Sequence, residues 1–303
     1  MIGAVLHVAH DAFQMLVTLP FRILFSGIHL SPPQRIRAVY SFSGFCLYHT
    51  KKGFPPRGGD AMSLFSIADL HLSLAADKPM DVFGSRWTSY TEKIEARWRA
   101  VVNEDDTVIV PGDISWAMTL EEARTDLAFI ESLPGRKLIG KGNHDYWWAT
   151  MSKMRQFTES CGFKTIDFLY NNAFACEDYI VCGTRGWYVE ERLQNASENA
   201  DYQKIVAREA TRLDLSLTEA ASLRGDSEKM ILCYLHFPPV FRNFVCRELV
   251  DVLHKHDVRH CYFGHIHGVY NVPRSTVFEG INMTLISADF LDFVPMITMP
   301  YDY

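Results

Sequence analysis

The 303-residue sequence lacks the cysteine patterns of specialised small folds. No two of its seven cysteines are spaced Cys-x-x-Cys, and their number is odd. A disulfide framework or a zinc knuckle is therefore disfavoured, and buried free thiols in a reducing compartment are the better interpretation. We accordingly expect a cytoplasmic protein.

Long apolar runs and an excess of basic residues are also missing. His7, Asp11 and Arg22 interrupt the N-terminal apolar stretch, which leaves no clean run of the roughly 18 residues that a membrane-spanning helix needs. The formal net charge is -6, whereas a general nucleic-acid binder usually has a basic face. The sequence therefore predicts neither a membrane nor a stable nucleic-acid partner.

Residues 1–61 differ from the rest because acidic side chains are scarce there. They hold six basic residues against two acidic ones, and no glutamate precedes Glu92. A membrane anchor is disfavoured for the reason given above. An organellar transit peptide is an alternative, because such peptides are also basic and poor in acidic residues. The favoured hypothesis is that residues 1–61 are translated upstream sequence and that Met62 is the true start. The codons of Gly58-Gly59-Asp60 can resemble a bacterial ribosome-binding site just before the Met62 codon. We expect 1–61 to be a poorly ordered extension and 62–303 to be the functional domain.

From Met62 onward, short apolar strands alternate with amphipathic helices. Thr119 and Glu122 form a capping box that predicts a helix start, and Pro134-Gly135 predicts its end. The other predicted helices lie at 86–102, 150–158, 197–223 and 246–256. The predicted strands lie at 64–67, 107–110, 137–139, 230–235 and 261–263, with a strand-like pattern over 276–297.

Five short stretches rich in Asp, Asn and His each follow one of these strands. They are Asp69-Leu70-His71, Gly112-Asp113, Gly142-Asn143-His144-Asp145, His236 and Gly264-His265-Ile266-His267. Taken alone, each could be a turn or a buried histidine. Together they occupy the carboxyl ends of strands, where the loops of an open α/β sheet converge on a ligand. One shared site is therefore a far better explanation than five unrelated turns.

The residue types of these stretches indicate metal chemistry at phosphorus. Carboxylate, amide and imidazole groups are the oxygen and nitrogen ligands of divalent transition metals. A pair of such metals suits in-line displacement at a phosphate and generates a nucleophile from water at neutral pH. The sequence therefore predicts a phosphohydrolase that depends on divalent metals.

The motif series resembles that of the calcineurin-like metallophosphoesterase superfamily, in particular a bacterial-type phosphohydrolase, over residues 62–303. The resemblance implies an α/β fold of four layers, with two stacked mixed β-sheets flanked by helices. It implies two divalent metals, most often Mn, Fe or Zn, and attack by a hydroxide that bridges them. His144 would then protonate the leaving group. The implied ligands are Asp69, His71 and His267 for one metal, Asn143, His236 and His265 for the other, and Asp113 for both.

One departure from the family pattern narrows the class of substrate that we expect. The protein Ser/Thr phosphatase branch has an Asp-Arg pair where this chain has Trp116 and Ala117. The usual carboxylate partner of His144 and a phosphate-binding arginine are both missing, which disfavours phosphoproteins as substrates. Arg185 and Trp147 are candidate substrate contacts, although a structural ion pair and core packing explain them about equally well.

We therefore predict hydrolysis of a phosphate ester in a small phosphorylated substrate. A nucleotide phosphodiesterase or nuclease of the same superfamily is the nearest alternative, and the acid-rich domain favours it little. A lipid-precursor pyrophosphatase would need an apolar cap, which the polar segment 187–226 does not provide. A non-catalytic interaction scaffold on this fold is the alternative of a different class, and the intact ligand set disfavours it.

Overall fold

The computed structural model describes residues 62–76, 78, 80–188 and 200–298. The predictions for residues 1–61, and for Cys46 among them, lie outside the described residues. All of the described helices and strands belong to the compact unit that begins at Gly58.

The first β-sheet has five strands, and four of them are parallel. The order β13-β1-β2-β3-β4 places consecutive parallel strands side by side, with β13 antiparallel at one edge. The strands are β1 (Leu64–Ser66), β2 (Thr107–Val110), β3 (Arg136–Ile139), β4 (Ile166–Phe168) and β13 (Met296–Ile297). Most residues of the four parallel strands are buried, as expected for strands that are covered on both faces.

The second β-sheet has six strands in the order β11-β12-β10-β7-β6-β5. Its four central strands are parallel, and the two edge strands, β5 and β11, pair antiparallel. The strands are β5 (Ala173–Cys176), β6 (Tyr179–Thr184), β7 (Met230–Leu235), β10 (His260–Phe263), β11 (Ser275–Phe278) and β12 (Ile281–Leu285). A separate short hairpin joins β8 (Val240–Phe241) to β9 (Phe244–Val245).

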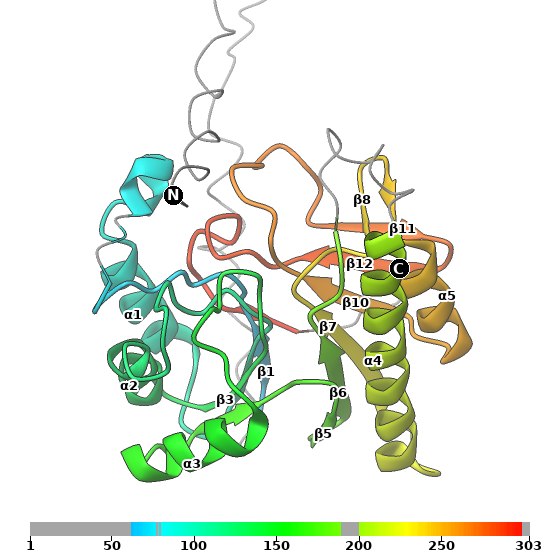
Figure 1. Ribbon diagram of the computed structural model, residues 1–303, viewed down its shortest axis with the longest axis horizontal. Helices are drawn as coiled ribbons and strands as arrows, with labels where there is room; N and C mark the ends of the chain where they lie inside the picture. Colours follow the sequence, from blue (N-terminus) through cyan, green and yellow to red (C-terminus); the bar gives the residue numbers. More distant parts are fainter. Residues whose placement is uncertain (1–61, 77, 79, 189–199, 299–303) are drawn as a thin grey trace, which may run out of the picture. The chain divides into compact units, whose positions relative to one another are not determined.

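Helices cover the outer faces of both sheets. Figure 1 shows α1, α2 and α3 beside the first sheet, and α4 and α5 beyond the second. The helices are α1 (Tyr90–Val101), α2 (Arg124–Ser132), α3 (Met151–Cys161), α4 (Ala200–Arg224) and α5 (Arg247–Lys255). One apolar core includes side chains of both sheets, such as Val108 and Tyr234, and a second joins the outer face of the second sheet to α4 and α5. The predicted architecture of two mixed sheets flanked by helices is confirmed.

Helix boundaries differ from the predictions where the backbone turns. The capping-box hydrogen bonds between Thr119 and Glu122 are present, but regular helix begins only at Arg124. The helix expected over 86–102 is a short 3-10 turn, Ser85–Trp87, followed by α1, because Ser89 adopts a left-handed backbone with φ 50°. The sequence pattern does not predict β4, β5 and β6, which lack clear alternation.

The described cysteines agree with the expected free thiols, and the described helices agree with the lack of long apolar runs in the sequence. None of the six described cysteines forms a disulfide, and five of them are buried. Within the described part of the chain, every helix is too short or too polar to span a bilayer.

Candidate metal centre

The five stretches meet where the carboxyl ends of the two sheets adjoin. Asp69, Asp113 and Asn143 follow β1, β2 and β3, while His236 and His265 follow β7 and β10. Backbone hydrogen bonds join these loops directly. The amide of Asp69 donates to Gly112 O at 3.0 Å, and the amide of Gly264 donates to His236 O at 3.1 Å. The loops therefore form one connected surface with rigid roots in both sheets.

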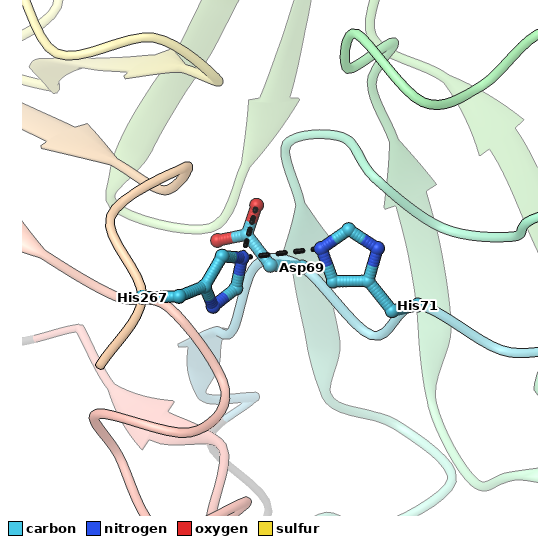
Figure 2. A group of neighbouring side chains, drawn as sticks. All are labelled: Asp69, His71 and His267. Atoms are coloured by element: carbon cyan, nitrogen blue, oxygen red, sulfur yellow. Dashed lines mark hydrogen bonds and ion pairs between the residues drawn. The ribbon is translucent and has the colours of Figure 1, made fainter. Parts of the chain in front are cut away.

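The first group of possible metal ligands consists of Asp69, His71 and His267, which Figure 2 shows converging from two loops. The Nε2 atoms of the two imidazoles lie 3.1 Å apart. His267 Nε2 is also 3.9 Å from Asp69 Oδ1. One donor atom from each residue thus faces the same point.

The second group consists of Asp113, His236 and His265. Asn143 lies against it, with its Oδ1 2.7 Å from His236 Nε2. The rings of His236 and His265 pack edge to face at a centroid distance of 5.2 Å. The seven residues that the family resemblance implies as ligands are therefore together in the fold.

Asp113 lies between the two groups. Its Oδ2 atom is 3.6 Å from His71 Nε2 in the first group and 3.6 Å from His236 Nε2 in the second. Its other oxygen, Oδ1, accepts a hydrogen bond of 2.8 Å from the amide of His144. One carboxylate oxygen is therefore held by the backbone while the other faces both groups.

The backbone at the centre is strained. Four of the seven residues adopt positive φ, which is uncommon outside glycine: Asp69 (60°), His71 (47°), Asp113 (51°) and His265 (68°). Such conformations cost free energy, and they cluster at functional sites where the surrounding structure enforces them. The loop geometry thus aims donor atoms inward at the expense of stability.

Two motif glycines allow this close approach. A Cβ atom on Gly142 would overlap the backbone nitrogen and Oδ1 of Asp113. A Cβ atom on Gly264 would overlap Asp69 Oδ2 and lie 2.6 Å from the Cβ of Ala68. Glycine precedes Asn143 and His265 because no side chain fits there.

Burial dominates the electrostatics of the centre. It raises the pKa of Asp69 to about 6, and it raises the pKa of Asp113 well above its usual value, with the charges of Asp145 and Asp69 adding to the shift. It also lowers the pKa of His71 and His236 well below the usual range and that of His265 to about 3. These histidines are therefore neutral at pH 7, the form in which imidazole binds metals.

The donor set fits two divalent cations. Within each group one donor atom from each residue lies within 4.8 Å of the others, so the three atoms are near enough to share an ion. Neutral imidazoles next to buried carboxylates match the preferences of Zn, Fe and Mn, and the carboxylates would be stabilised by a cation.

Asp289 supports the first group and was not predicted from the sequence. Its Oδ1 atom is 2.8 Å from His267 Nδ1, and its Oδ2 accepts hydrogen bonds from the Gly268 amide and the Tyr270 hydroxyl. The pair leaves His267 Nε2 facing His71, as in carboxylate–histidine–metal arrangements. The signal in the sequence is an acidic residue inside the apolar stretch that follows a strand.

Asp145 orders the loops and does not contact the His144 ring. Its Oδ2 accepts hydrogen bonds from the amides of Asp113 (2.9 Å) and Gly142 (2.7 Å). Its Oδ1 accepts from the amides of Ile114 and Ser115 and from the Trp147 indole. This buried carboxylate therefore ties the second stretch to the third.

We expect Asp145→Asn to lower the free energy of unfolding by at least about 3 kcal/mol. The side-chain nitrogen of asparagine would replace one acceptor and leave two loop amides unpaired, and each hydrogen bond to a charged group is worth about 1.5–3 kcal/mol. Burial raises the pKa of Asp145, but the loss of these hydrogen bonds outweighs the relief of a buried charge. Urea denaturation of the metal-free protein measures the change. The control is Asp167→Asn, which breaks a half-exposed ion pair with Arg136 and should cost at most about 1 kcal/mol. Equal losses for both variants would contradict this role of Asp145.

His144 lies beside the first group and packs against Trp116. The two rings are 4.3 Å apart between centroids, and Trp116 also stacks on His71 at 5.1 Å. Trp116, at the sequence position where the protein Ser/Thr phosphatase branch has an aspartate, therefore packs directly against the His144 ring. Burial, followed by the charges of His267 and Lys78, lowers the pKa of His144 to about 4.

The two predicted substrate contacts differ in position. Trp147 is only 2% exposed and donates its indole N–H to Asp145 Oδ1 at 3.0 Å, so a structural role replaces the predicted substrate contact. Arg185 follows β6 next to the second group, is partly exposed, and lies 3.6 Å from the buried carboxylate of Glu209.

The solved structures that are similar to this chain include the following two. One is a protein of unknown function, AQ665, from Aquifex aeolicus, with 14% identity, a TM-score of 0.42, and coverage of 78% of this chain and 96% of that one. The other is the phosphopantetheinyl hydrolase PptH from Mycobacterium tuberculosis, with 13% identity, a TM-score of 0.45, and coverage of 79% and 96%. No curated protein matches the sequence. The family model described as calcineurin-like phosphoesterase matches residues 62–269, more than half of the chain. This protein therefore belongs to the calcineurin-like phosphoesterase family.

Proposed function

We propose that this protein hydrolyses a phosphate ester in a small phosphorylated substrate with the help of two divalent cations. Asp69, His71 and His267 would hold one cation, and Asn143, His236 and His265 the other. Asp113 would serve both. When bound, the cation pair would neutralise charge on the phosphate oxygens and acidify a water molecule.

The observation that carries the proposal is the position of Asp113. One of its carboxylate oxygens lies at the same distance, 3.6 Å, from an imidazole nitrogen of each group. A carboxylate whose oxygen faces both ligand groups suits a pair of cations, because its charge offsets part of the charge of each. A single-metal site would need no such shared oxygen.

The remaining roles follow from the side chains around the centre. The neutral imidazoles keep a lone pair available at pH 7, since burial opposes their protonation. Asp289 fixes the ring of His267 through Nδ1. His144 would donate a proton to the leaving oxygen as the P–O bond breaks. Because its pKa is low in the free protein, we expect it to gain that proton together with the substrate, whose negative charge offsets burial.

Metal analysis combined with a substrate panel tests the proposal. We expect about two divalent ions per chain, loss of activity on chelation, and recovery with Mn, Fe or Zn. The panel should contain a phosphomonoester, a phosphodiester and a pyrophosphate. One ion per chain in the active enzyme would refute the binuclear part, and a preference for the diester would favour the phosphodiesterase alternative. No bound metal and no hydrolysis with any divalent ion would favour a non-catalytic scaffold.

A further inference from the structure

Two basic residues stand next to the second ligand group. Strands β6 and β7 pair in parallel with Thr184 opposite Leu235, so Arg185 and His236 emerge side by side at the same edge. The amide of Phe237 donates to Arg185 O at 2.9 Å and fixes this arrangement. Lys141 lies two residues before Asn143, whose Oδ1 contacts His236. Arg185 and Lys141 are therefore both held close to Asn143 and His236.

A third basic residue, Arg212, reaches the same place from α4, which packs along β5 and β6 (Figure 1). Its Nη1 atom is 2.6 Å from Glu209 Oε1, and Arg185 Nη2 is 3.6 Å from the same oxygen. Glu209 is fully buried, whereas the side chains of Arg185 and Arg212 remain 22% and 31% exposed. The buried glutamate thus anchors two guanidinium groups and leaves both open to solvent.

The cluster of Lys141, Arg185 and Arg212 has more positive charge than its described surroundings balance. Glu209 can neutralise one cation, and no described residue forms a hydrogen bond or ion pair with the Lys141 ammonium. The Lys141 ammonium is close enough to Arg185 and Arg212 for their charges to act on it, and Asp145 and Glu209 are the acidic groups that act on it as well. The Asp145 carboxylate is occupied by its hydrogen bonds to the loops. Cations gathered in this way attract an anion.

Aromatic packing sets how far this cluster lies from the metal centre. The Arg185 guanidinium packs over the rings of Trp187 and Phe237, at 5.7 and 5.9 Å from their centroids. The Phe237 ring is in turn 4.5 Å from the ring of His265. Arg185 is therefore separated from a candidate metal ligand by one aromatic ring, which suits an anion on the same substrate rather than the phosphate that is cleaved.

We propose that Lys141, Arg185 and Arg212 form an anion subsite that holds a second phosphoryl group of the substrate, so that the preferred substrates are phosphoesters with a further phosphate. The assignment of the substrate class rests on the proposed phosphoesterase activity, while the anion subsite itself does not. Guanidinium groups suit a phosphoryl group because they offer paired N–H donors in a planar fork.

The first test is binding of inorganic pyrophosphate to the metal-free protein, measured by isothermal titration calorimetry at low salt. We expect the wild-type chain to bind it and Lys141→Met to weaken binding at least about tenfold. Lys141→Met removes no described ion pair, so the fold should be retained. Arg185→Met gives an independent second variant. The matched control is Arg136→Met, which removes a partly exposed arginine paired with Asp167 elsewhere on the chain and should change affinity less than about twofold.

The second test compares two substrates of the metal-loaded enzyme, glucose 1,6-bisphosphate and glucose 6-phosphate. We expect kcat/KM to favour the bisphosphate, and Lys141→Met to reduce this preference at least about tenfold, while Arg136→Met keeps it. Equal pyrophosphate affinity of wild type and Lys141→Met would overturn the subsite, and an unchanged preference would overturn the substrate class. Failure to hydrolyse either sugar phosphate or any panel substrate would count against the proposed function, and the calorimetry would still decide the subsite.

Discussion

Replacement of Asp113 by asparagine is expected to lower kcat at least about 100-fold, because the loss of even an outer partner of a metal ligand costs 10–100-fold. Asp113 Oδ2 faces an imidazole nitrogen of each ligand group at 3.6 Å. Asparagine keeps an oxygen that can accept from the His144 amide, but it removes the charge shared by both groups. Steady-state hydrolysis of 4-nitrophenyl phosphate, with metal content measured in parallel, gives the effect.

The same substitution should stabilise the metal-free protein. Burial and the charges of Asp145 and Asp69 raise the pKa of Asp113, so an ionised Asp113 carboxylate destabilises the folded metal-free chain at neutral pH. This loss of folding stability is present above the usual pKa of an aspartate, and it disappears as the carboxylate is protonated at lower pH. Asparagine removes it at every pH. Asp113→Asn should therefore raise the denaturation midpoint of the metal-free protein at pH 7 while it abolishes activity. Unchanged activity would refute the shared-ligand role, and a lowered midpoint would contradict the expected relief of a buried charge.

His144→Asn is expected to slow hydrolysis of an alkyl phosphate by about 10²–10⁴, the range of general acid catalysis. A 4-nitrophenyl ester should be affected far less, because nitrophenolate leaves as an anion and needs no proton. The comparison of kcat for the two esters, wild type against variant, measures proton donation separately from binding. Trp116→Phe serves as the control, since it keeps an aromatic ring against His144 and should retain the leaving-group dependence of the wild type.

An equal loss with both esters would contradict the role of His144 as a proton donor. It would indicate that the side chain acts through the charge or packing of the centre, where its ring lies 5.6 Å from that of His71. Rescue of the variant by a leaving group of low basicity would instead support the proposed step.

The site could be anticipated from the sequence because each candidate stretch follows the carboxyl end of a predicted strand. β1, β2, β3, β7 and β10 are buried apolar runs, and such runs are recognisable from local composition. The polar residue that follows each run must lie at the carboxyl edge of its sheet. This reasoning places all five stretches at strand ends, and the structure then shows that Asp69, Asp113 and Asn143 follow strands of one sheet while His236 and His265 follow strands of the other. The order of the motifs then indicates a single centre.

The same reasoning could not find the contacts that support the centre. Asp289 contacts His267 across 22 positions, and Asp145 contacts Asp113 and Ile114 across more than 30. Glu209 meets Arg185 only because α4 packs against β6. No local pattern marks these pairs, since each depends on how separate elements pack. Strands β4, β5 and β6 were equally hidden, because their sequences show no clear two-residue period.

The amino-acid sequence alone determined which chemistry this chain carries, because metal ligands are a matter of side-chain type and of the strand ends that present them. It also excluded the Asp-Arg pair of the phosphoprotein phosphatases through Trp116 and Ala117. Only the tertiary structure decided how the ligands are shared, oriented and surrounded. Asp113 lies between the two groups, and Asp289 orients the ring of His267. Beside the second group lie Lys141, Arg185 and Arg212, because the two sheets and α4 meet at one edge. Charge balance and hydrogen-bond geometry depend on distances of a few ångströms, and those are set by packing across the whole domain.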